Sequence, residues 1–496
     1  MKTKYIFFSI FILSLLGCKD FLVETPLVQV GVSNAFGNYK SADAYAKGVY
    51  NLNGDVTWYA AELSDICAGR GSWSISNDWS LIFNVTNVSR TAPSWDVFFR
   101  NINICNNVID NVASVPDGTQ ADKDALLGEA YFWRAWYYYW MVRLWGDVPL
   151  RLHAPLNSEP DNVNLPRAKV SEVYVQILAD FTKASVLCPL KWPSSDWGRP
   201  TKWSAKGYIA EANLTLGNWA TARDVAKEVI DNSGMSLVII NVPSDYNKIY
   251  GTATTDGTNT EELLAIHVAN NIPGYGLQLP MYYNSHITPA NTEFCTQAQF
   301  GAIFGNLKSP INKAWKDADI RKKWGFTTNW VNPATGLTIN LSPASVQSEG
   351  FAITKWRGQA AAWTDYGNDL QFMRLSDAYL IYAEAAAMAN AGNPTPDAIE
   401  KLNVVRRRAY AKPLKAAAPG IDYVSGGVFR DTVLVERCYE FIGENHRFVD
   451  LKRTGQLAAR IQEAWGVTLN PNRLLWPIST NETLVNKNCP QNPGYQ

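Results

Sequence analysis

The stretch YFWRAWYYYWMVRLWGD (131–147) carries nine aromatic residues within its first fifteen positions. Aromatic rings on a surface bind ligands, whereas rings in a core contribute bulk. At helical spacing the rings cover two faces, with Phe132, Trp136 and Tyr139 on one and Trp133, Tyr137 and Trp140 on the other. A helix that is apolar all round is buried all round. We therefore predict a structural helix over 121–144, ended by Gly146 and Pro149 and buried by other helices.

Further segments have the apolar spacing of helices, over 39–52, 94–113 and 171–187. Two longer segments, 199–234 and 374–409, place small residues where a tetratricopeptide repeat packs its helices closely. These residues are Ala210, Gly217 and Ala222 in the first segment and Ala385, Gly392 and Ala398 in the second. Because one repeat cannot bury its own apolar face, repeats stack. We predict a mainly α fold on a tetratricopeptide-like scaffold, although any amphipathic helical hairpin has the same spacing.

Two regions lack long helical periods. Residues 54–93 are rich in Gly, Ser, Asn and Trp, and residues 241–370 are rich in Gly, Pro, Asn and Thr. Within the second region only 261–269 and 351–358 resemble strands. Long loops in a compact domain tend to be functional. We expect a loop-rich, irregular and surface-borne insertion with a few short strands.

The composition excludes several classes of function. The 496 residues carry 45 basic and 45 acidic side chains, so no basic excess favours nucleic acid as a partner. The 4 His, in a chain with 19 Trp and 23 Tyr, lack the spacing of metal ligands. The sequence contains no Gly-rich phosphate loop and no Ser nucleophile elbow. We expect no cofactor, no metal in the binding site, and recognition by ring stacking.

The N-terminus has the pattern of a bacterial lipoprotein signal. Lys2 and Lys4 precede an apolar run from Tyr5 to Leu16, which is too short to span a bilayer. The run ends in LLGC, so we predict cleavage after Gly17 and lipidation of Cys18, with an ordinary secretory signal as the alternative. The Lys-Asp pair after the cysteine resembles a signal for export to the outer face of the outer membrane. The prediction is a lipid-anchored protein at the cell surface.

The remaining cysteines are far apart in the chain, at Cys67, Cys105, Cys188, Cys295, Cys438 and Cys489. None forms a CxxC pair or a Cys/His pattern. We expect most of them to be buried singly, and we assign no disulfide.

Several motifs, in order, resemble the SusD/RagB family of outer-membrane nutrient-binding lipoproteins. They are LLGC, GEAYFWRAWYYYWMVRLWGDVPL, GRPTKWSAKGYIAEANLTLG, MRLSDAYLIYAEAAA and ERCYEFIGENHRFVDLKRTG. A further pattern places Arg167, Glu172, Tyr174, Ile177 and Asp180 at the family's positions. Pro200 is a small departure, because it interrupts the usual Arg-Ala-Thr-like start of one motif. The resemblance covers nearly the whole chain.

What the resemblance implies is a glycan-binding protein that is not an enzyme. Family members share four tetratricopeptide units, bind ligands through loops, and cover a SusC-like TonB-dependent transporter. The expected organisation is a signal peptide (1–17), a lipidated tether (18–38), an N-terminal helical region (39–240) with the aromatic loop 54–93, a ligand-binding insertion (241–370) and a C-terminal region (371–496). The expected partners are an oligosaccharide or polysaccharide, the transporter, and the outer membrane through the lipid anchor.

The segment GRGSWSISNDWS, in the first loop, is the strongest candidate for the ligand site. Trp rings stack on sugar faces, while polar side chains in a loop bind hydroxyl groups and would need partners if buried. The candidates are Arg70, Trp73, Asn77, Asp78 and Trp79 in the loop, and Tyr282, Tyr283, Trp324 and Trp330 in the insertion, where the family commonly contacts its ligand. Packing beneath a loop is the alternative for each of them.

Two other classes of function remain open. Glu62 and Asp65 could be the carboxylate pair of a surface-anchored glycan-degrading enzyme, although such a pair needs a fixed separation. The protein could also be an adaptor for the transporter without a ligand of its own. The segment ENHRFVDLKR groups Glu444, His446, Arg447 and Asp450, but we expect a buried ionic network there and not a catalytic site.

Overall fold

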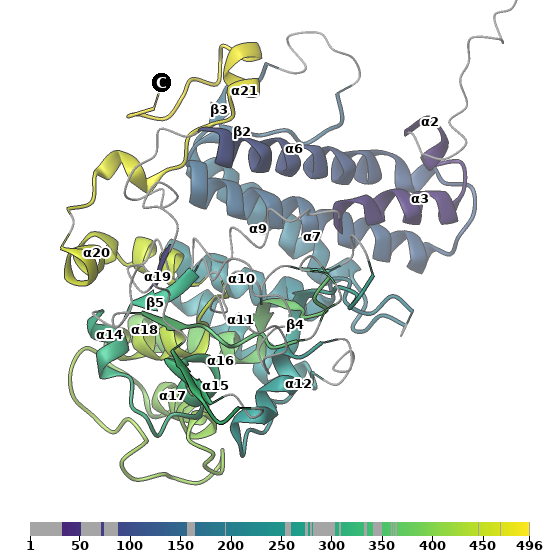
Figure 1. The fold of residues 1–496 in the computed structure, drawn as a ribbon. Helices are drawn as coiled ribbons and strands as arrows, with labels where there is room; N and C mark the ends of the chain where they lie inside the picture. The colour runs from purple at the N-terminus through teal and green to yellow at the C-terminus, as the bar shows by residue number, and fades with distance from the viewer. Residues whose placement is uncertain are drawn as a thin grey trace, which may run out of the picture.

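The computed structural model is dominated by helices that lie side by side in one continuous stack (Figure 1). The described residues are 32–50, 71–73, 88–155, 164–193, 195–252, 259–272, 276–277, 280, 303–306, 309–331, 335–340, 350–358, 360, 362, 365–444, 446–466 and 468–495. Within them the predicted mainly α, tetratricopeptide-like architecture is confirmed.

The helices of the described residues are α2 (Val32–Ala35), α3 (Tyr39–Ala46), α6 (Val88–Asn111), α7 (Gln120–Trp145), α9 (Val170–Leu187), α10 (Lys202–Leu216), α11 (Trp219–Asn232), α12 (Asn247–Tyr250), α14 (Pro310–Ala314), α15 (Ile320–Gly325), α16 (Leu375–Ala389), α17 (Pro396–Ala409), α18 (Phe429–Glu440), α19 (Arg447–Arg453), α20 (Leu457–Trp465) and α21 (Thr480–Val485). Short 3₁₀ turns are η3 (Lys47–Tyr50), η6 (Val112–Ser114), η7 (Pro243–Tyr246) and η10 (Pro471–Leu474). The strands are β1 (Gly71–Trp73), β2 (Val148–Pro149), β3 (Arg167–Ala168), β4 (Glu262–Ile266), β5 (Ile303–Asn306), β6 (Asn329–Val331), β7 (Thr338–Asn340), β8 (Gly350–Ala352) and β9 (Leu370–Arg374).

Each long helix packs on the next one along the stack. The order is α6, α7, α9, α10, α11, α16 and α17, with α18 against α16. The two predicted repeats are the helix pairs α10–α11 and α16–α17. Gly217 ends α10 in the left-handed region at φ 77°, which a residue with a side chain rarely adopts. Ala210 and Ala222 are fully buried where the helices approach, as the small-residue pattern predicts.

Helix α7 lies inside this stack, and every residue from Phe132 to Trp145 is buried. Trp133, Trp136 and Trp140 are 1%, 2% and 7% exposed. Thr119 and Asp122 form a capping box at the start of the helix, each side chain accepting from the other residue's backbone N–H. The prediction that the aromatic run is structural is confirmed.

A buried ion pair fastens α7 to α9. Arg134 donates through Nε and Nη2 to the two carboxylate oxygens of Asp180, at 2.8 and 2.9 Å. Its Nη1 also donates to Oδ1 of Asn106 on α6, at 2.9 Å. Breaking one member of a buried pair leaves an uncompensated charge, at a cost of about 3–5 kcal/mol. The two residues, both part of the family motifs, therefore join three helices.

The C-terminal segment satisfies the backbone carbonyls at the end of α7. A helix leaves its last four C=O groups without partners inside the helix. Lys452 Nζ donates to the Arg143 carbonyl at 2.6 Å, and the Trp476 N–H donates to the Leu144 carbonyl at 2.7 Å. Asn492 Nδ2 donates to the Trp145 carbonyl at 2.9 Å. Residues more than three hundred positions downstream thus cap the buried helix, which explains the motifs near the C-terminus.

The insertion is less peripheral than its composition predicts. Strand β4 pairs antiparallel with β9, which leads directly into α16. Trp315, Ile353 and Trp356 belong to the main hydrophobic core. The expectation of a surface-borne insertion is therefore wrong for these described parts, because each contributes apolar side chains that the stack buries. The predicted strand over 351–358 is limited to Gly350–Ala352.

Four cysteines fall within the described residues. Cys105, Cys188, Cys438 and Cys489 are buried, and within the described residues they form no disulfide, as expected. Cys67 and Cys295, like the lipidation site Cys18, lie outside the described residues. In the described part of the chain, no helix has both the length and the apolar character needed to cross a bilayer.

The cap on α7 gives a prediction for stability. Asn492→Ala removes the bonds to the Trp145 and Trp476 carbonyls and the acceptor for Arg167. Because the freed carbonyls stay buried, we expect a loss of about 2–3 kcal/mol in the free energy of unfolding, measured by urea denaturation. Asn393→Ala, in the exposed turn between α16 and α17, is the matched control and should change it by less than about 0.5 kcal/mol. Equal losses in the two variants would contradict the capping role.

Candidate functional site

A three-stranded sheet brings the aromatic loop and the insertion together. Strand β1 pairs antiparallel with β5, and β5 pairs antiparallel with β8. In this register Trp73 is opposite Ile303, and Ser72 is opposite Phe304. The Trp-containing segment of the first loop is therefore the edge of a sheet whose other strands belong to the insertion.

The sheet continues beyond β8 through one further bridge. Thr327 and Ala352 exchange backbone hydrogen bonds of 3.0 and 2.9 Å, on the side of β8 that faces away from β5. Thr327 is followed by β6, which contains Trp330. Neighbouring strands are about 4.8 Å apart, so three spacings put the backbone of β1 roughly 14 Å from Thr327. Trp73 is thus on the edge strand of this sheet, and Trp330 is on the neighbouring β6–β7 hairpin, which the Thr327–Ala352 bridge connects to the sheet.

Trp324 is placed differently from the expectation. It is only 4% exposed, and its ring Nε1 donates to the Lys355 carbonyl at 3.0 Å. The Arg357 guanidinium lies 3.8 Å from the ring centroid, and Tyr246 is stacked alongside at 6.5 Å. With its ring covered in this way, Trp324 has no free face for a sugar. The prediction that it is a ligand platform is corrected: it anchors the segment that carries Thr327 and Trp330.

Residues 354–357 complete that anchor. The Thr354 hydroxyl donates to the Trp324 carbonyl at 2.6 Å, and Arg357 Nη2 donates to the same carbonyl at 2.7 Å. The Thr327 and Thr354 hydroxyls are 2.8 Å apart. The segment 324–327 and the residues that follow β8 are therefore joined by side chains as well as by the backbone.

Lys355 connects this segment to a buried ionic cluster, the Arg374 cluster, made of Lys355, Arg374, Arg408, Glu261, Glu440 and Glu444. Lys355 Nζ binds the Glu444 carboxylate and donates to the Ile442 carbonyl at 3.0 Å. Burial lowers the pKa of Lys355 to about 8, since the nearby Arg374 also opposes its charge and Glu444 only partly offsets both. Three cations and three carboxylates balance one another inside the core.

The segment ENHRFVDLKR is structural, as expected. Asp450 accepts from Arg437 Nε at 2.7 Å and from Arg453 Nη2 at 2.7 Å. Burial and the adjacent Arg437 hold the pKa of His446 well below its usual range, so the imidazole is neutral. His446 is buried, and its Nδ1 is 3.5 Å from Asp377. His446 and Asp450 are therefore part of the buried ionic network, whereas Arg447 lines a groove that opens to solvent.

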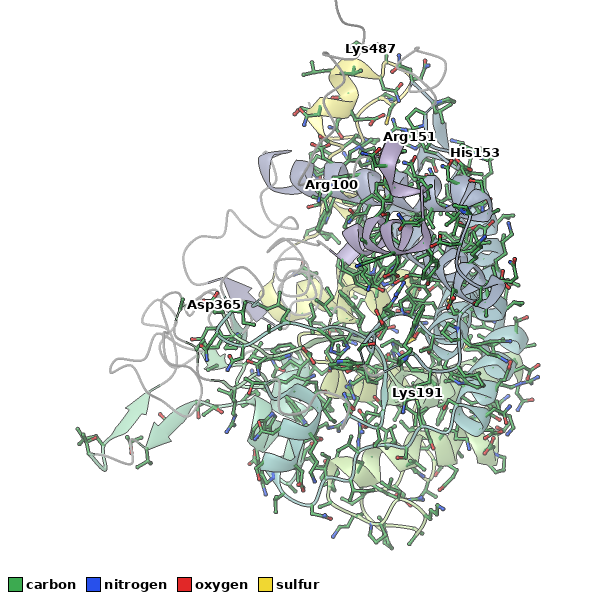
Figure 2. All side chains as sticks on the ribbon, turned by 90° about the vertical axis from the view of Figure 1, so that its right-hand side faces the viewer. Arg100, Arg151, His153, Lys191, Asp365 and Lys487 are labelled. Carbon is green, nitrogen blue, oxygen red and sulfur yellow. The ribbon has the colours of Figure 1, made fainter. Side chains whose placement is uncertain are left out.

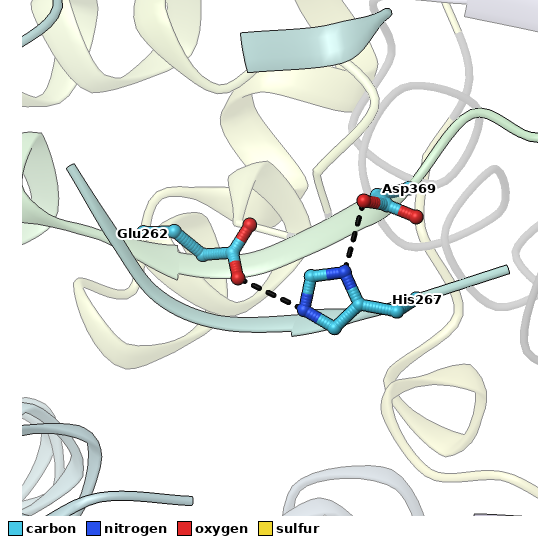
Figure 3. Close-up of side chains that lie close together, drawn as sticks. All are labelled: Glu262, His267 and Asp369. Carbon is cyan, nitrogen blue, oxygen red and sulfur yellow. Dashed lines mark hydrogen bonds and ion pairs between the residues drawn. The ribbon is translucent and has the colours of Figure 1, made fainter. Parts of the chain in front are cut away.

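A second ionic contact ties β4 to the start of β9 (Figure 3). His267 Nε2 is 2.9 Å from a Glu262 oxygen, and its Nδ1 is 2.9 Å from an Asp369 oxygen. Burial alone would lower the pKa of His267, but the two carboxylates outweigh it and raise the pKa to about 10. The two carboxylates bind opposite nitrogens of one imidazole ring. In this arrangement, a single metal ion could not be coordinated by all three side chains. The arrangement is that of an imidazolium bridging two carboxylates.

Six of the nine candidate ligand residues lie outside the described residues: Arg70, Asn77, Asp78, Trp79, Tyr282 and Tyr283. The two carboxylates considered for an enzyme, Glu62 and Asp65, also lie outside them. Trp73 and Trp330 are described through their backbone in β1 and β6. Sequence reasoning missed Lys355, Arg357 and His267, because their partners are distant in the chain and no local pattern marks them.

Comparisons with known proteins agree with this architecture. One family model, described as starch-binding associating with outer membrane, matches residues 29–214, and a second, described as the SusD family, matches residues 303–495. The chain belongs to the SusD/RagB family. A SusD-like protein of Formosa agariphila is 24% identical over 98% of this chain and 97% of its own.

The fold of the family is equally clear among solved structures. A SusD homologue from Bacteroides thetaiotaomicron superposes with a TM-score of 0.80 at 19% identity, over 94% of this chain and 99% of that one. A laminarin-binding SusD-like protein gives a TM-score of 0.74 at 20% identity, over 93% and 100%. Surface glycan-binding protein A from Bacteroides fluxus gives 0.72 at 19% identity, over 92% and 99%.

The His267 contact predicts a pH-dependent contribution to stability. Since the pKa of His267 rises from 6.5 to about 10 on folding, the stabilisation is complete below about pH 6.5 and is lost as the pH rises through about 10. We expect His267→Gln to cost a few kcal/mol in urea unfolding at pH 6, and the gap to wild type to narrow steadily towards pH 10. A gap that is the same at both pH values would contradict the charged state of His267.

Proposed function

We propose that this SusD/RagB protein binds a glycan at the cell surface and delivers it to a SusC-like TonB-dependent transporter. The observation that carries the proposal is the β1–β5–β8 sheet, which connects the segment of Trp73 to that of Trp330. Segments that carry Trp73 and Trp330, from two separate loop regions, are thereby held on one support. Such an arrangement suits an extended ligand that contacts several rings.

The proposed ligand site uses the aromatic loop and the insertion. Its candidate residues are Arg70, Trp73, Asn77, Asp78, Trp79, Tyr282, Tyr283 and Trp330. Aromatic rings would stack on the apolar faces of pyranose rings, and the polar side chains would exchange hydrogen bonds with hydroxyl groups. Binding of this kind is reversible and has no covalent step. A rigid support lowers the ordering cost of binding, which increases affinity.

The comparisons support a glycan as the class of ligand. One family model is described as starch-binding, one structural relative binds laminarin, and another is a surface glycan-binding protein. These relatives differ in the glycan they name, so the linkage recognised by this chain is open. The scaffold is common to them, and we infer that specificity comes from the loops.

The lipid anchor and the transporter belong to the same proposal. Lipidation at Cys18 would tether the protein to the outer membrane, and residues 19–38 would set the distance between the membrane and the folded part of the chain. The outer side of α9 supports a protein partner, because Val175 and Val186 are 72% and 77% exposed on this helix, and Leu190, shortly after its end, is 63% exposed. A transporter that covers this side would bury all three.

If Trp73 and Trp330 stack on the ligand, removing their rings should lower the affinity for it. Because truncating an aromatic anchor typically costs about 2 kcal/mol or more, we expect Trp73→Ala and Trp330→Ala each to weaken binding roughly 30-fold or more. Isothermal titration calorimetry with the preferred glycan measures the change. Tyr131→Ala, a partly exposed aromatic position of α7, is the matched control and should retain wild-type affinity. Unchanged binding in both Trp variants would remove these residues from the site, and binding of no glycan by the wild type would favour an adaptor.

Product analysis separates this proposal from an enzyme. The protein should return oligosaccharides and polysaccharides unchanged after prolonged incubation. Turnover that is abolished by Glu62→Gln or Asp65→Asn would establish a glycan-degrading enzyme and contradict the proposed function.

A further inference from the structure

A hollow lies between α14, α18 and α20. It has a volume of about 180 Å³, which is room for several water molecules, and it opens to solvent. Ile311, Leu434 and Val435 form an apolar part of its wall, and Asp431, Arg460 and Glu463 form a polar part. We call it the α18 groove. It contains none of the residues of the proposed loop site.

The groove contains a buried cation with few partners. Arg447 is 7% exposed, and it lines the groove. Among the residues that the structure describes, its guanidinium makes one hydrogen bond, from Nη1 to the Leu434 carbonyl at 3.2 Å, and no ion pair. A guanidinium has five N–H donors, and no Arg447 nitrogen is among the buried atoms that lack a partner, so its remaining donors are accessible from the groove. Several donors of Arg447 are therefore free for a ligand rich in oxygen acceptors.

The rim of the groove offers a chain of donors and acceptors. Gln456 Nε2 donates to Asp431 Oδ1 at 2.8 Å, while Arg460 Nη2 donates to Gln456 Oε1 at 3.2 Å. Arg460 also binds Glu463 through Nη1, at 2.9 and 2.6 Å. Together with Arg447, the lining has two basic and two acidic groups, so its charges balance. A neutral ligand with several hydroxyl groups and an apolar face matches this lining better than an ion does.

The groove adjoins the sheet along the chain. Ser309, which lines the groove, follows the end of β5 by three residues, a span of at most about 11 Å. Figure 1 shows β5 close to α14 and α18. Tyr439 of α18 fixes α14 in place, because its hydroxyl donates to the Ile311 carbonyl at 2.9 Å and its ring stacks on Trp315 at 4.8 Å. The wall of the groove is thus preformed.

We propose that the α18 groove is a further subsite that takes a sugar unit of a longer glycan chain bound at the sheet. This inference rests on the proposed glycan-binding function and extends it. Arg447, Gln456 and Arg460 would donate to the sugar's oxygens, Asp431 would accept from a hydroxyl group, and the apolar wall would pack against the ring. A protein with this subsite favours chains long enough to reach both places.

The test uses a variant that fills the groove and removes no contact. Val435, on α18, is 38% exposed and lines the groove, so Val435→Phe would occupy the space. Val424→Phe, at a position 78% exposed before α18, is the matched control. Gln456→Ala is a second groove variant, and thermal melts check that each variant folds. Affinity gels with laminarin, starch and xylan select the polysaccharide, and calorimetry then uses its disaccharide and hexasaccharide.

We expect Val435→Phe and Gln456→Ala to weaken hexasaccharide binding about tenfold, as the loss of one well-bonded contact implies, and to leave disaccharide binding unchanged. Val424→Phe should match the wild type for both ligands. If the folded groove variants bind the hexasaccharide as the wild type does, while Trp73→Ala weakens it, the subsite is contradicted and the proposed function stands. If no polysaccharide retards the wild type, the proposed function fails, and the subsite fails with it.

Discussion

The rest of the structure depends on the ionic contacts that Arg374 makes inside the core. Its Nε donates to Glu444 at 2.8 Å, and its Nη1 contacts Glu261 and Glu440 at 2.5 and 2.9 Å. These partners come from the start of β4, the end of α18 and the turn after it, so one fully buried side chain joins the insertion to the helical stack. Charges this deep are costly unless every one is paired. Lys355 and Arg408 complete the pairing, and Lys355 extends the cluster into the segment that follows β8. Because the buried charges on the insertion and on the helical stack need each other as partners, the chain can fold only with the insertion in this position.

Helix α7 imposes the second constraint. Its aromatic surface needs neighbours on all sides, and its C-terminal carbonyls need donors that α7 itself cannot provide. The stack supplies the neighbours, and Lys452, Trp476 and Asn492 supply the donors. Burial and capping together explain why residues near the C-terminus lie against a helix from the N-terminal third of the chain. The helical stack is thus closed by contacts between distant parts of the sequence.

Local signals made the helical part predictable. The all-round apolar pattern of α7, the small residues Ala210 and Ala222, and the turn at Gly217 act over a few residues, and each is where the sequence indicates. The insertion was not predictable in this way. The pairing of β1 with β5 joins segments far apart in the chain, and neither strand has a strong pattern of its own. Trp324 is the clearest example. The composition of its segment resembles that of a surface ligand site, yet its ring N–H binds the Lys355 carbonyl and Arg357 covers its ring. The role of His267 likewise follows only from its contacts with Glu262 and Asp369, which a local sequence pattern does not reveal.

The central claim is that the Arg374 cluster fixes the insertion on the helical stack and so preorganises the sheet proposed to bind glycan. Hydrogen–deuterium exchange on Lys355→Met tests it most directly, because Glu444 keeps its contact with Arg374 in that variant and the chain should still fold. Exchange should become faster in 324–327 and 350–358, with α7 as well protected as in the wild type and no change in the exposed control Lys316→Met. Unchanged exchange in those two segments would contradict the claim, as would a loss of protection spread evenly over the whole chain.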